Sequence, residues 1–242
     1  MKNIIITGAS GGIGKEIVKT LAKKNTRLIV LYNTNSTEVE SLKNNLEQTC
    51  EIVVYKCNLT NAENIEKMVE HIVNNFKTID VLINCAGISK IQQIQDTTEQ
   101  DYYEVMDTNL KSVILLTALI SKNMISNKSG KIVNISSMWG TVGASMESLY
   151  SASKGAINAL TLSLAKELGP SNITVNAICP GLIDTKMNNS LGKETINSIV
   201  EETPLGRIGK PKDVANLVEF LISNKASFIT GQIITVDGGF TL

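Results

Sequence analysis

The sequence has 242 residues, 43% of them hydrophobic and 19% charged, which is ordinary for a globular protein with a sizeable core. Lysine plus arginine equals aspartate plus glutamate at 23 each, so no net charge favours nucleic acid or an anionic membrane as a partner. The N-terminal apolar run is too short for a signal peptide, and no stretch approaches the roughly 20 apolar residues that span a bilayer, so the cytoplasm is the expected location.

Short β-rich runs alternate with longer amphipathic segments along the whole chain. Strands are expected at residues 3–7, 27–32, 51–56, 79–84, 131–136, 174–178 and 233–236, and helices at 12–24, 37–48, 62–76, 99–123, 149–168 and 211–223. Continuous apolar strands separated by helices are typical of a parallel sheet covered on both faces. The sequence therefore predicts one α/β domain over residues 1–242, a doubly wound parallel sheet of the Rossmann type.

The segment 182–204 follows an expected strand but is polar and has only a weak helical pattern. Ligands bind beyond the carboxyl ends of the strands in such folds. We therefore expect this segment to lie over the site as a lid, with an ordinary surface excursion as the alternative.

Glycines fall between the first expected strand and the first expected helix, in the stretch Thr7-Gly8-Ala9-Ser10-Gly11-Gly12-Ile13-Gly14. Gly8, Gly12 and Gly14 permit a tight turn and let the backbone approach a pyrophosphate at the N-terminus of the helix. Although the spacing is not the Gly-x-Gly-x-x-Gly of the commoner fingerprint, its place in the first βα turn predicts a dinucleotide site. Ser10 and Ile13 are expected among its contacts.

The end of the second expected strand favours NADPH over NAD as the cofactor. An acid there would bind the ribose hydroxyls of NAD and repel the 2′-phosphate of NADP. The chain has Tyr32-Asn33-Thr34-Asn35-Ser36, with no acid before Glu38, so Asn33 and its neighbours are free to bond the phosphate. No lysine or arginine in this stretch supplies a charged clamp.

Cysteine and histidine usage argues against other chemistry. Cys50, Cys57, Cys85 and Cys179 show no Cys-x-x-Cys pairing and are interpreted as buried free thiols, so neither a metal site nor a disulfide is predicted. His71 is the only histidine and lies in a polar helical stretch, which disfavours a Ser-His-Asp hydrolase.

The stretch Tyr150-Ser151-Ala152-Ser153-Lys154 places a phenol and an ammonium one helical turn apart on one face. The positive charge of Lys154 is expected to lower the pKa of the phenol, ordinarily about 10, by favouring the phenolate. A phenol tuned in this way exchanges a proton with a carbonyl or an alcohol near neutral pH.

Further motifs continue along the chain: Asn84-Cys85-Ala86-Gly87 after the fourth strand, Asn109 in the long helix, Ser137 thirteen residues before Tyr150, Pro180-Gly181-Leu182-Ile183-Asp184-Thr185, and Thr230-Gly231-Gln232 with Asp237-Gly238-Gly239. Together with the glycine loop they make the chain resemble a short-chain dehydrogenase/reductase over essentially its whole length.

The resemblance implies a role for each matching position. Tyr150 would donate the proton to a carbonyl oxygen that Ser137 hydrogen-bonds, while Lys154 would tune the tyrosine and hold the nicotinamide ribose. Asn109 would position a water that resupplies the proton through Lys154. The implied cofactor contacts are Asn58 and Leu59 at the adenine, Asn84, Ala86 and Gly87 after the fourth strand, and Pro180, Gly181, Ile183 and Thr185 at the nicotinamide. For Asn84 and Asn109 the alternative is that they pin backbone.

Within the family, the stretches from Asn172 to Ala177 and from Pro204 to Arg207 resemble 3-oxoacyl-acyl-carrier-protein reductases, which implies a substrate held on an acyl carrier protein. Those enzymes dock the carrier on two basic positions beside the active-site mouth. Lys128 matches one of them, whereas Ser171 stands where an arginine is expected.

The loop from Ser136 to Ser151 resembles instead the bacterial aminopentanone reductases, which reduce a ketone on a modified lysine of elongation factor P. Trp139 would wall a substrate channel, and Glu147, three residues before Tyr150, would pair with a substrate ammonium. The alternative is that Trp139 is core packing and Glu147 a solvated charge.

We therefore expect NADPH-dependent reduction of a ketone to a secondary alcohol, with the acyl-carrier substrate ranked first and modified elongation factor P second. An inactive dinucleotide-binding sensor of this fold would lack the tyrosine and the lysine, and an NAD-dependent alcohol dehydrogenase would carry an acid after the second strand. The family resemblance also implies a homotetramer formed through the long helices and the last strand.

Overall fold

The structure is a computed structural model and describes residues 1–188 and 191–242. A parallel β-sheet forms the centre of the molecule. Within these residues the sheet has seven strands in the order β3-β2-β1-β4-β5-β6-β7, and each neighbouring pair is parallel. The strands are β1 (Lys2–Ile6), β2 (Thr26–Tyr32), β3 (Glu51–Lys56), β4 (Val81–Asn84), β5 (Gly130–Ile135), β6 (Ile173–Pro180) and β7 (Ile233–Val236). This arrangement confirms the predicted doubly wound α/β fold.

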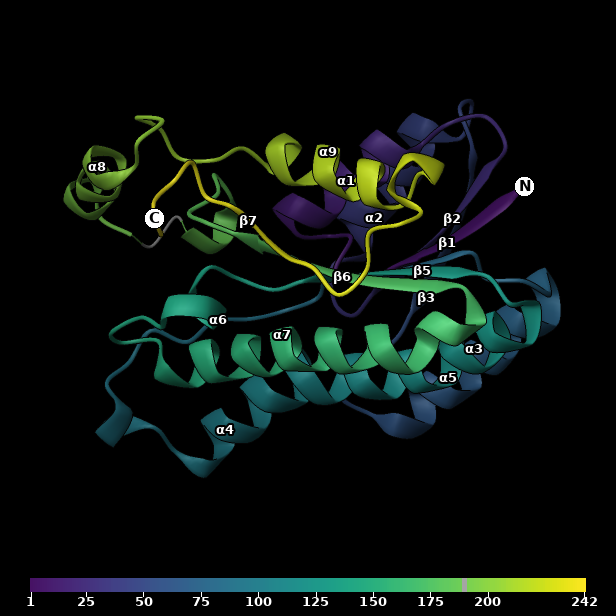
Figure 1. Ribbon diagram of the computed structural model, residues 1–242, viewed down its shortest axis with the longest axis horizontal. Coiled ribbons are helices and arrows are strands. Elements are labelled where there is room, and N and C mark those ends of the chain that lie inside the picture. The colour runs from purple at the N-terminus through teal and green to yellow at the C-terminus, as the bar shows by residue number, and fades with distance from the viewer. Residues whose placement is uncertain (189–190) are drawn as a thin grey trace.

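Helices cover both faces of the sheet (Figure 1). One face packs against α1 (Gly12–Leu21), α2 (Ser36–Leu46) and α9 (Pro211–Leu221), and the other against α3 (Ala62–Phe76), α5 (Ser112–Asn127) and α7 (Ser148–Leu168). Because the strands are buried from both sides, their side chains fill two separate apolar cores, which accounts for the continuous hydrophobic runs in the sequence. None of the helices in the described ranges is long and apolar enough to cross a membrane.

The long helix expected over residues 99–123 is interrupted. It consists of α4 (Glu99–Met106), a π-helical turn (Asp107–Lys111) and α5, and the N–H of Ser112 bonds the carbonyl of Asp107 across that turn. A π turn inserts one extra residue, which shifts the side chains that follow it around the helix axis, and such turns are frequent at functional sites. Asn109 lies in this turn and is completely buried.

Two further helices lie near the carboxyl ends of the strands. The short α6 (Trp139–Val142) has only four residues, too few for its periodicity to be seen in the sequence. The helix α8 (Lys193–Glu202) falls within the predicted lid segment 182–204, of which residues 189–190 lie outside the described residues. Its side chains Thr195 and Ile199 line the large cavity described below, so this part of the segment does cover the site. Its function as a moving lid stays a prediction.

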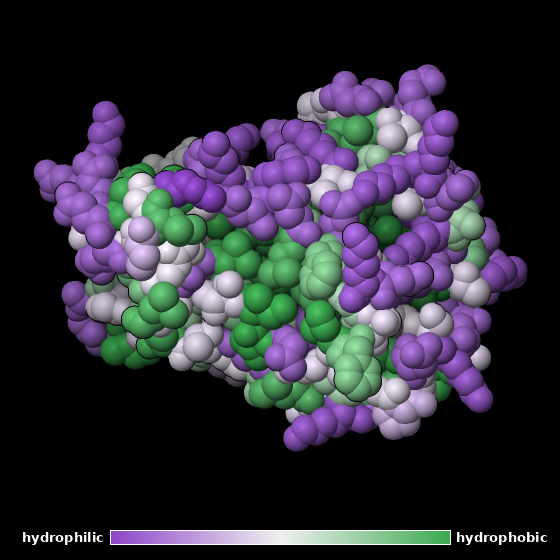
Figure 2. Space-filling view, turned by 45° about the horizontal axis from the view of Figure 1, so that its top comes forward, coloured by the Kyte–Doolittle hydropathy of each residue, from purple (hydrophilic) through white to green (hydrophobic). Residues whose placement is uncertain are grey.

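The sheet order fixes where a ligand binds. The chain runs outward from β1 through β2 to β3 and then returns to β4 on the other side of β1, so the order reverses between β1 and β4. The loops at the carboxyl ends of these two strands diverge to opposite faces and leave a crevice between them. Hydrophilic side chains cover most of the face seen in Figure 2, with hydrophobic side chains gathered near its middle.

Candidate active site

The glycine loop fits its surroundings only without side chains. Gly8 has φ +67°, and a Cβ there would lie 2.7 Å from the Cα of Ala86. A Cβ on Gly14 would lie 2.2 Å from the carbonyl oxygen of Gly8, and one on Gly12 would lie 2.7 Å from Cγ2 of Thr185. The loop therefore packs at backbone distance against the segments that follow β4 and β6.

Thr7 holds two of these segments together. Its hydroxyl oxygen accepts hydrogen bonds from the backbone N–H groups of Cys85 at 2.9 Å and Ala86 at 3.0 Å, and the side chain is buried. This role of Thr7 was not predicted from the sequence. Its signal is only its position, a buried hydroxyl at the carboxyl end of the first strand directly before Gly8.

A cavity of about 1600 Å³ runs over the carboxyl ends of the strands. Nineteen of the predicted site residues line it: Gly8, Ser10, Gly12, Ile13, Gly14, Asn33, Asn58, Leu59, Ala86, Gly87, Ser137, Trp139, Glu147, Tyr150, Lys154, Pro180, Gly181, Ile183 and Thr185. Segments that are far apart in the sequence thus form one continuous wall, from the glycine loop to the start of α7.

The two predicted asparagines lie behind this wall rather than on it. Asn84 donates from Nδ2 to Oδ1 of Asn134 at 2.9 Å and to Oγ1 of Thr117 at 3.2 Å, and only 3% of its surface is exposed. Asn84 thus ties β4 to β5 and α5 and is not among the residues that line the cavity. The cofactor contact that the family resemblance implies for Asn84 stays a prediction.

Asn109 clamps the backbone of Ile88 from both sides. Its Oδ1 accepts from the Ile88 N–H at 2.8 Å, and its Nδ2 donates to the Ile88 carbonyl at 2.9 Å and to Oγ of Ser153 at 3.0 Å. The π turn aims the amide at this loop, which continues from Gly87 beside the cavity. Asn109 therefore pins backbone, and the water-positioning role that the family resemblance implies stays a prediction.

Lys154 and Tyr150 meet on one face of α7 as predicted. The ammonium of Lys154 is buried, donates to the carbonyl of Ile135 at 2.9 Å, and lies 5.7 Å from the centroid of the Tyr150 ring. Burial lowers the pKa of Lys154 to about 8, because the charged ammonium loses hydration.

The expected low pKa of Tyr150 is not what the structure shows. Burial raises the pKa of the phenol to about 12, with the neighbouring Ser137 hydroxyl lowering it and the charge of Glu147 raising it further. The prediction is wrong because the sequence shows the spacing to Lys154 but not the desolvation of the phenol. A phenol with this pKa is protonated at neutral pH, the state that a proton donor requires.

Ser137 and Trp139 are fixed by local contacts. The Ser137 hydroxyl oxygen accepts from the backbone N–H of Trp139 at 3.2 Å, and Ser137 is buried. The indole of Trp139, which lines the cavity, packs edge-on to Phe240 with ring centroids 5.9 Å apart, so Phe240 supports this part of the wall from behind. Phe240, near the C-terminus, could not be linked to the site from the sequence.

Glu147 lies at the N-terminus of α7 and is half-buried. Its carboxylate accepts a hydrogen bond from the hydroxyl of Ser89, and both residues line the cavity. The carboxylate of Glu147, three residues before Tyr150, adds negative charge to the end of the cavity where a substrate would enter.

Two lysines bring positive charge to the opposite end of the cavity. Lys15, in the first turn of α1, and Lys186, in the 3-10 turn Lys186–Asn188, both line the cavity and both pair with Glu38. Hydrogen bonding to Lys15, and then to Lys186, holds the pKa of Glu38 below its ordinary value. The stretch 32–36 has no basic residue, but the fold supplies cations from elsewhere in the chain.

The residues that surround the cavity fit a dinucleotide. Glycine backbone at the N-terminus of α1 suits a pyrophosphate. A Cβ on Gly87 would lie only 3.2 Å from Nζ of Lys154, so a side chain at this position would crowd the lysine. Asn33, Asn58 and Leu59 line the other end, where Lys15 and Lys186 lie.

Lys128 lies away from this site. It ends α5 at the amino edge of the sheet, and its carbonyl accepts from Nδ2 of Asn172 at 3.3 Å. Tyr150 is in the first turn of α7, whose 21 residues extend about 30 Å before Ser171 is reached. Within one chain, Lys128 and Ser171 are therefore not beside the active-site mouth, which corrects the expectation drawn from the carrier-protein reductases.

The chain is similar to known proteins over almost its whole length. The family model described as enoyl-(acyl carrier protein) reductase matches residues 8–241. The protein named uncharacterized oxidoreductase YmfI of Bacillus subtilis is 40% identical over 99% of this chain and 98% of its own length. Proteins named 3-oxoacyl-[acyl-carrier-protein] reductase FabG of Staphylococcus epidermidis and Thermotoga maritima are each 36% identical, over 98% and 100% of this chain and 98% of each relative.

Proposed function

Because the chain belongs to the short-chain dehydrogenase/reductase family, and so is an oxidoreductase acting on CH–OH and C=O groups, we propose that it reduces a ketone to a secondary alcohol with NADPH. One observation carries the proposal: Tyr150, Ser137 and Lys154 converge at one end of a cavity that fits a dinucleotide. An inactive sensor would have no use for this trio.

Each residue of the site has a separate role in the reduction of the carbonyl group. The hydride for the carbonyl carbon would come from NADPH when it is bound in the cavity. Tyr150 begins protonated, since its pKa is about 12, and donates its proton to the carbonyl oxygen as negative charge develops there. Ser137 hydrogen-bonds the same oxygen, and the buried Lys154 ammonium stabilises the tyrosinate that is left. Asn109 positions Lys154 indirectly, through the loop that follows Gly87.

The NADPH preference rests on charge. Lys15 and Lys186 line the cavity, as does Asn33 after β2, and Glu38 already pairs with both lysines, so we expect the 2′-phosphate to bind here. A dianionic phosphate would compete with Glu38 for these ammonium groups, whereas the neutral ribose hydroxyl of NADH gains much less. This arrangement supports NADPH and makes NAD the weaker cofactor.

For the substrate, we rank a 3-oxoacyl thioester on acyl carrier protein first, because relatives named as such reductases align over almost the whole chain. Because Lys128 lies at the amino edge of the sheet, a carrier protein that docks on Lys128 would have to deliver its substrate to the active site of another subunit. The second candidate is the aminopentanone-modified lysine of elongation factor P, which Glu147 favours because a fixed carboxylate in the cavity attracts an ammonium and repels an acidic carrier.

The test measures NADPH oxidation with a short 3-oxoacyl thioester and with ketone-bearing elongation factor P. Tyr150→Phe should abolish turnover of the true substrate while NADPH binding persists; full activity in this variant would overturn the mechanism. Glu147→Gln should weaken turnover of the modified factor only. Glu104→Gln is the matched control, because Glu104 also lines the cavity but already pairs with Lys90 at 2.6 Å.

A homotetramer and a cytoplasmic location complete the proposal. Large hydrophobic side chains are exposed on α5 (Ile114, Ile125), on α7 (Leu162) and near the last strand (Phe228, Leu242), as an assembly through these elements would require. Four free cysteines suit a reducing compartment. A monomer at micromolar concentration in sedimentation would contradict the assembly.

A further inference from the structure

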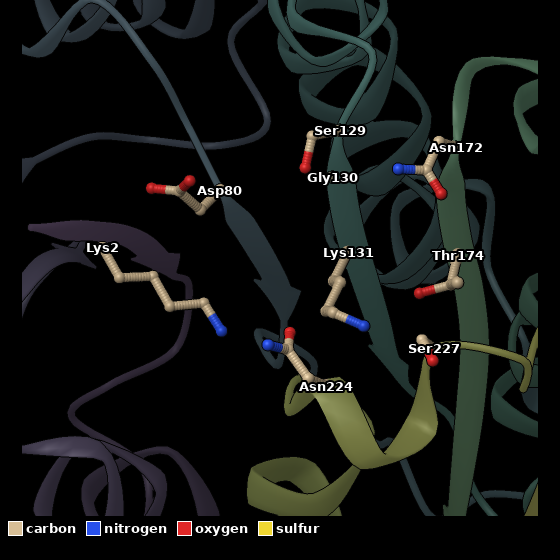
Figure 3. Close-up of a pocket in the computed structure, with 9 residues that line it drawn as sticks. All are labelled: Lys2, Asp80, Ser129, Gly130, Lys131, Asn172, Thr174, Asn224 and Ser227. Carbon is tan, nitrogen blue, oxygen red and sulfur yellow. The ribbon is translucent and has the colours of Figure 1, made fainter.

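A second cavity, of about 480 Å³, opens at the amino ends of the strands, on the opposite edge of the sheet from the active site. Figure 3 shows Lys2 from β1 and Lys131 from β5 on its walls, with Asn224 and Ser227 approaching from the segment that follows α9. The proposed reaction uses none of these residues.

The strand register explains why both lysines face the same side of the sheet. Lys131 is aligned with Val81 on one neighbouring strand and with Thr174 on the other, and Val81 is aligned with Ile4. Lys2 precedes Ile4 by two residues, so it shares the face of Ile4. Ile4 and Val81 belong to the apolar core under α1 and α9, and the two ammonium groups therefore enter at the margin of that core.

The positive charge in this cavity is poorly compensated. Within residues 1–188 and 191–242 the ammonium of Lys131 has no hydrogen-bond or ion-pair partner, and the ammonium of Lys2 donates only to the backbone carbonyl of Ile222, at 2.7 Å. Asp80 is the one carboxylate on the wall, and its Oδ2 accepts from the N–H of Asn3 at 2.7 Å. Two cations thus face one carboxylate that is already engaged.

Burial disfavours the charged form of both lysines. It lowers the pKa of Lys131, and it lowers the pKa of Lys2, which the charge of Lys131 lowers further while Asp80 opposes the change. A partly buried charge without a partner costs folding free energy unless a counter-ion neutralises it. The hydroxyls of Thr174 and Ser227, which also face the cavity, add hydrogen-bond donors to the same wall.

We propose that this cavity binds the phosphate group of a small ligand, held by the ammonium groups of Lys2 and Lys131 and by the hydroxyls of Thr174 and Ser227. A tetrahedral oxyanion has enough oxygens to accept from all four side chains, and it supplies the negative charge that the wall lacks. The ligand is either inorganic phosphate or a phosphate monoester, since the cavity has room for more than the anion alone.

Calorimetric titration of the full chain with inorganic phosphate tests this site, with NADPH at saturation so that phosphate does not enter the glycine loop. Lys131→Gln should weaken phosphate binding at least tenfold. Lys128→Gln is the matched control, an exposed lysine at the same edge that does not line the cavity, and it should change binding less than twofold. No heat with the unaltered protein, or an equal loss in both variants, would overturn the proposal.

Thermal unfolding distinguishes a phosphate-binding role of Lys131 from a purely structural one. In phosphate-free buffer Lys131→Met should unfold at the same temperature as the unaltered protein or higher, and added phosphate should raise the midpoint of the unaltered protein alone. A variant that is less stable without phosphate and gains equally from it would refute the site. Tighter binding of phenyl phosphate than of inorganic phosphate identifies a monoester ligand, and equal affinity identifies the free ion; both results support the site.

Discussion

Replacing Asn109 with alanine should destabilise the protein and weaken cofactor binding together. Asn109 is completely buried, and its amide satisfies both the N–H and the carbonyl of Ile88. A buried polar group left without a partner costs roughly 1–3 kcal/mol, and water would enter part of the space left by the amide, so we expect a loss of about 3 kcal/mol. For a chain of this size, that loss lowers the unfolding midpoint by roughly 6–12 °C.

The assay combines thermal unfolding with NADPH binding by fluorescence. Asn123→Ala is the matched control, because Asn123 makes a similar pair of backbone contacts far from the cavity: it accepts from Ile79 at 2.9 Å and donates to Lys77 at 2.7 Å. The control should lose stability and keep its affinity for NADPH. An Asn109→Ala protein with an unchanged unfolding midpoint and lost activity would refute the clamp and favour a role in proton supply.

Three further results are expected. Gly14→Ala should lose NADPH binding and at least about 3 kcal/mol of stability, since its Cβ would meet backbone at 2.2 Å, whereas Gly169→Ala, whose Cβ meets nothing within 4 Å, should match the unaltered protein in the same assays. Lys15→Ala should reduce the preference for NADPH over NADH at least tenfold in steady-state kinetics, and an equal reduction in Lys19→Ala, on the same helix but off the cavity, would count against the phosphate contact. The rate of reduction should fall as pH rises through about 8, where Lys154 loses its proton, and Lys154→Arg should move that fall upward; a fall at the same pH in the variant would contradict the assignment.

The strands and most helices follow from local sequence patterns. All seven expected strands are present because each is a short apolar run bounded by polar residues or glycine, which only a strand buried on both faces accommodates. The glycine loop and the Tyr150–Lys154 pair were equally accessible, since both depend on residues close together in the chain. The break at Asp107–Lys111 was not, because a π turn has no distinct hydrophobic period.

The electrostatic character of the site depended on packing. The sequence placed Lys154 one turn from Tyr150, but only the tertiary structure decided that burial, more than that charge, sets the phenol pKa. Likewise, Lys15 and Lys186 are 171 positions apart in the chain and meet at Glu38 only after folding.

Local spacing therefore determined the fold class, and it predicted the dinucleotide loop and the proposed proton donor with its lysine. The tertiary structure decided that Asn84 and Asn109 support the cavity from behind, and that Lys128 lies at the opposite edge of the sheet. The physical reason is that secondary structure follows from neighbours along the chain. The hydration of a side chain, the charges around it and its distance from the site depend on segments that meet only when the sheet and its helices pack.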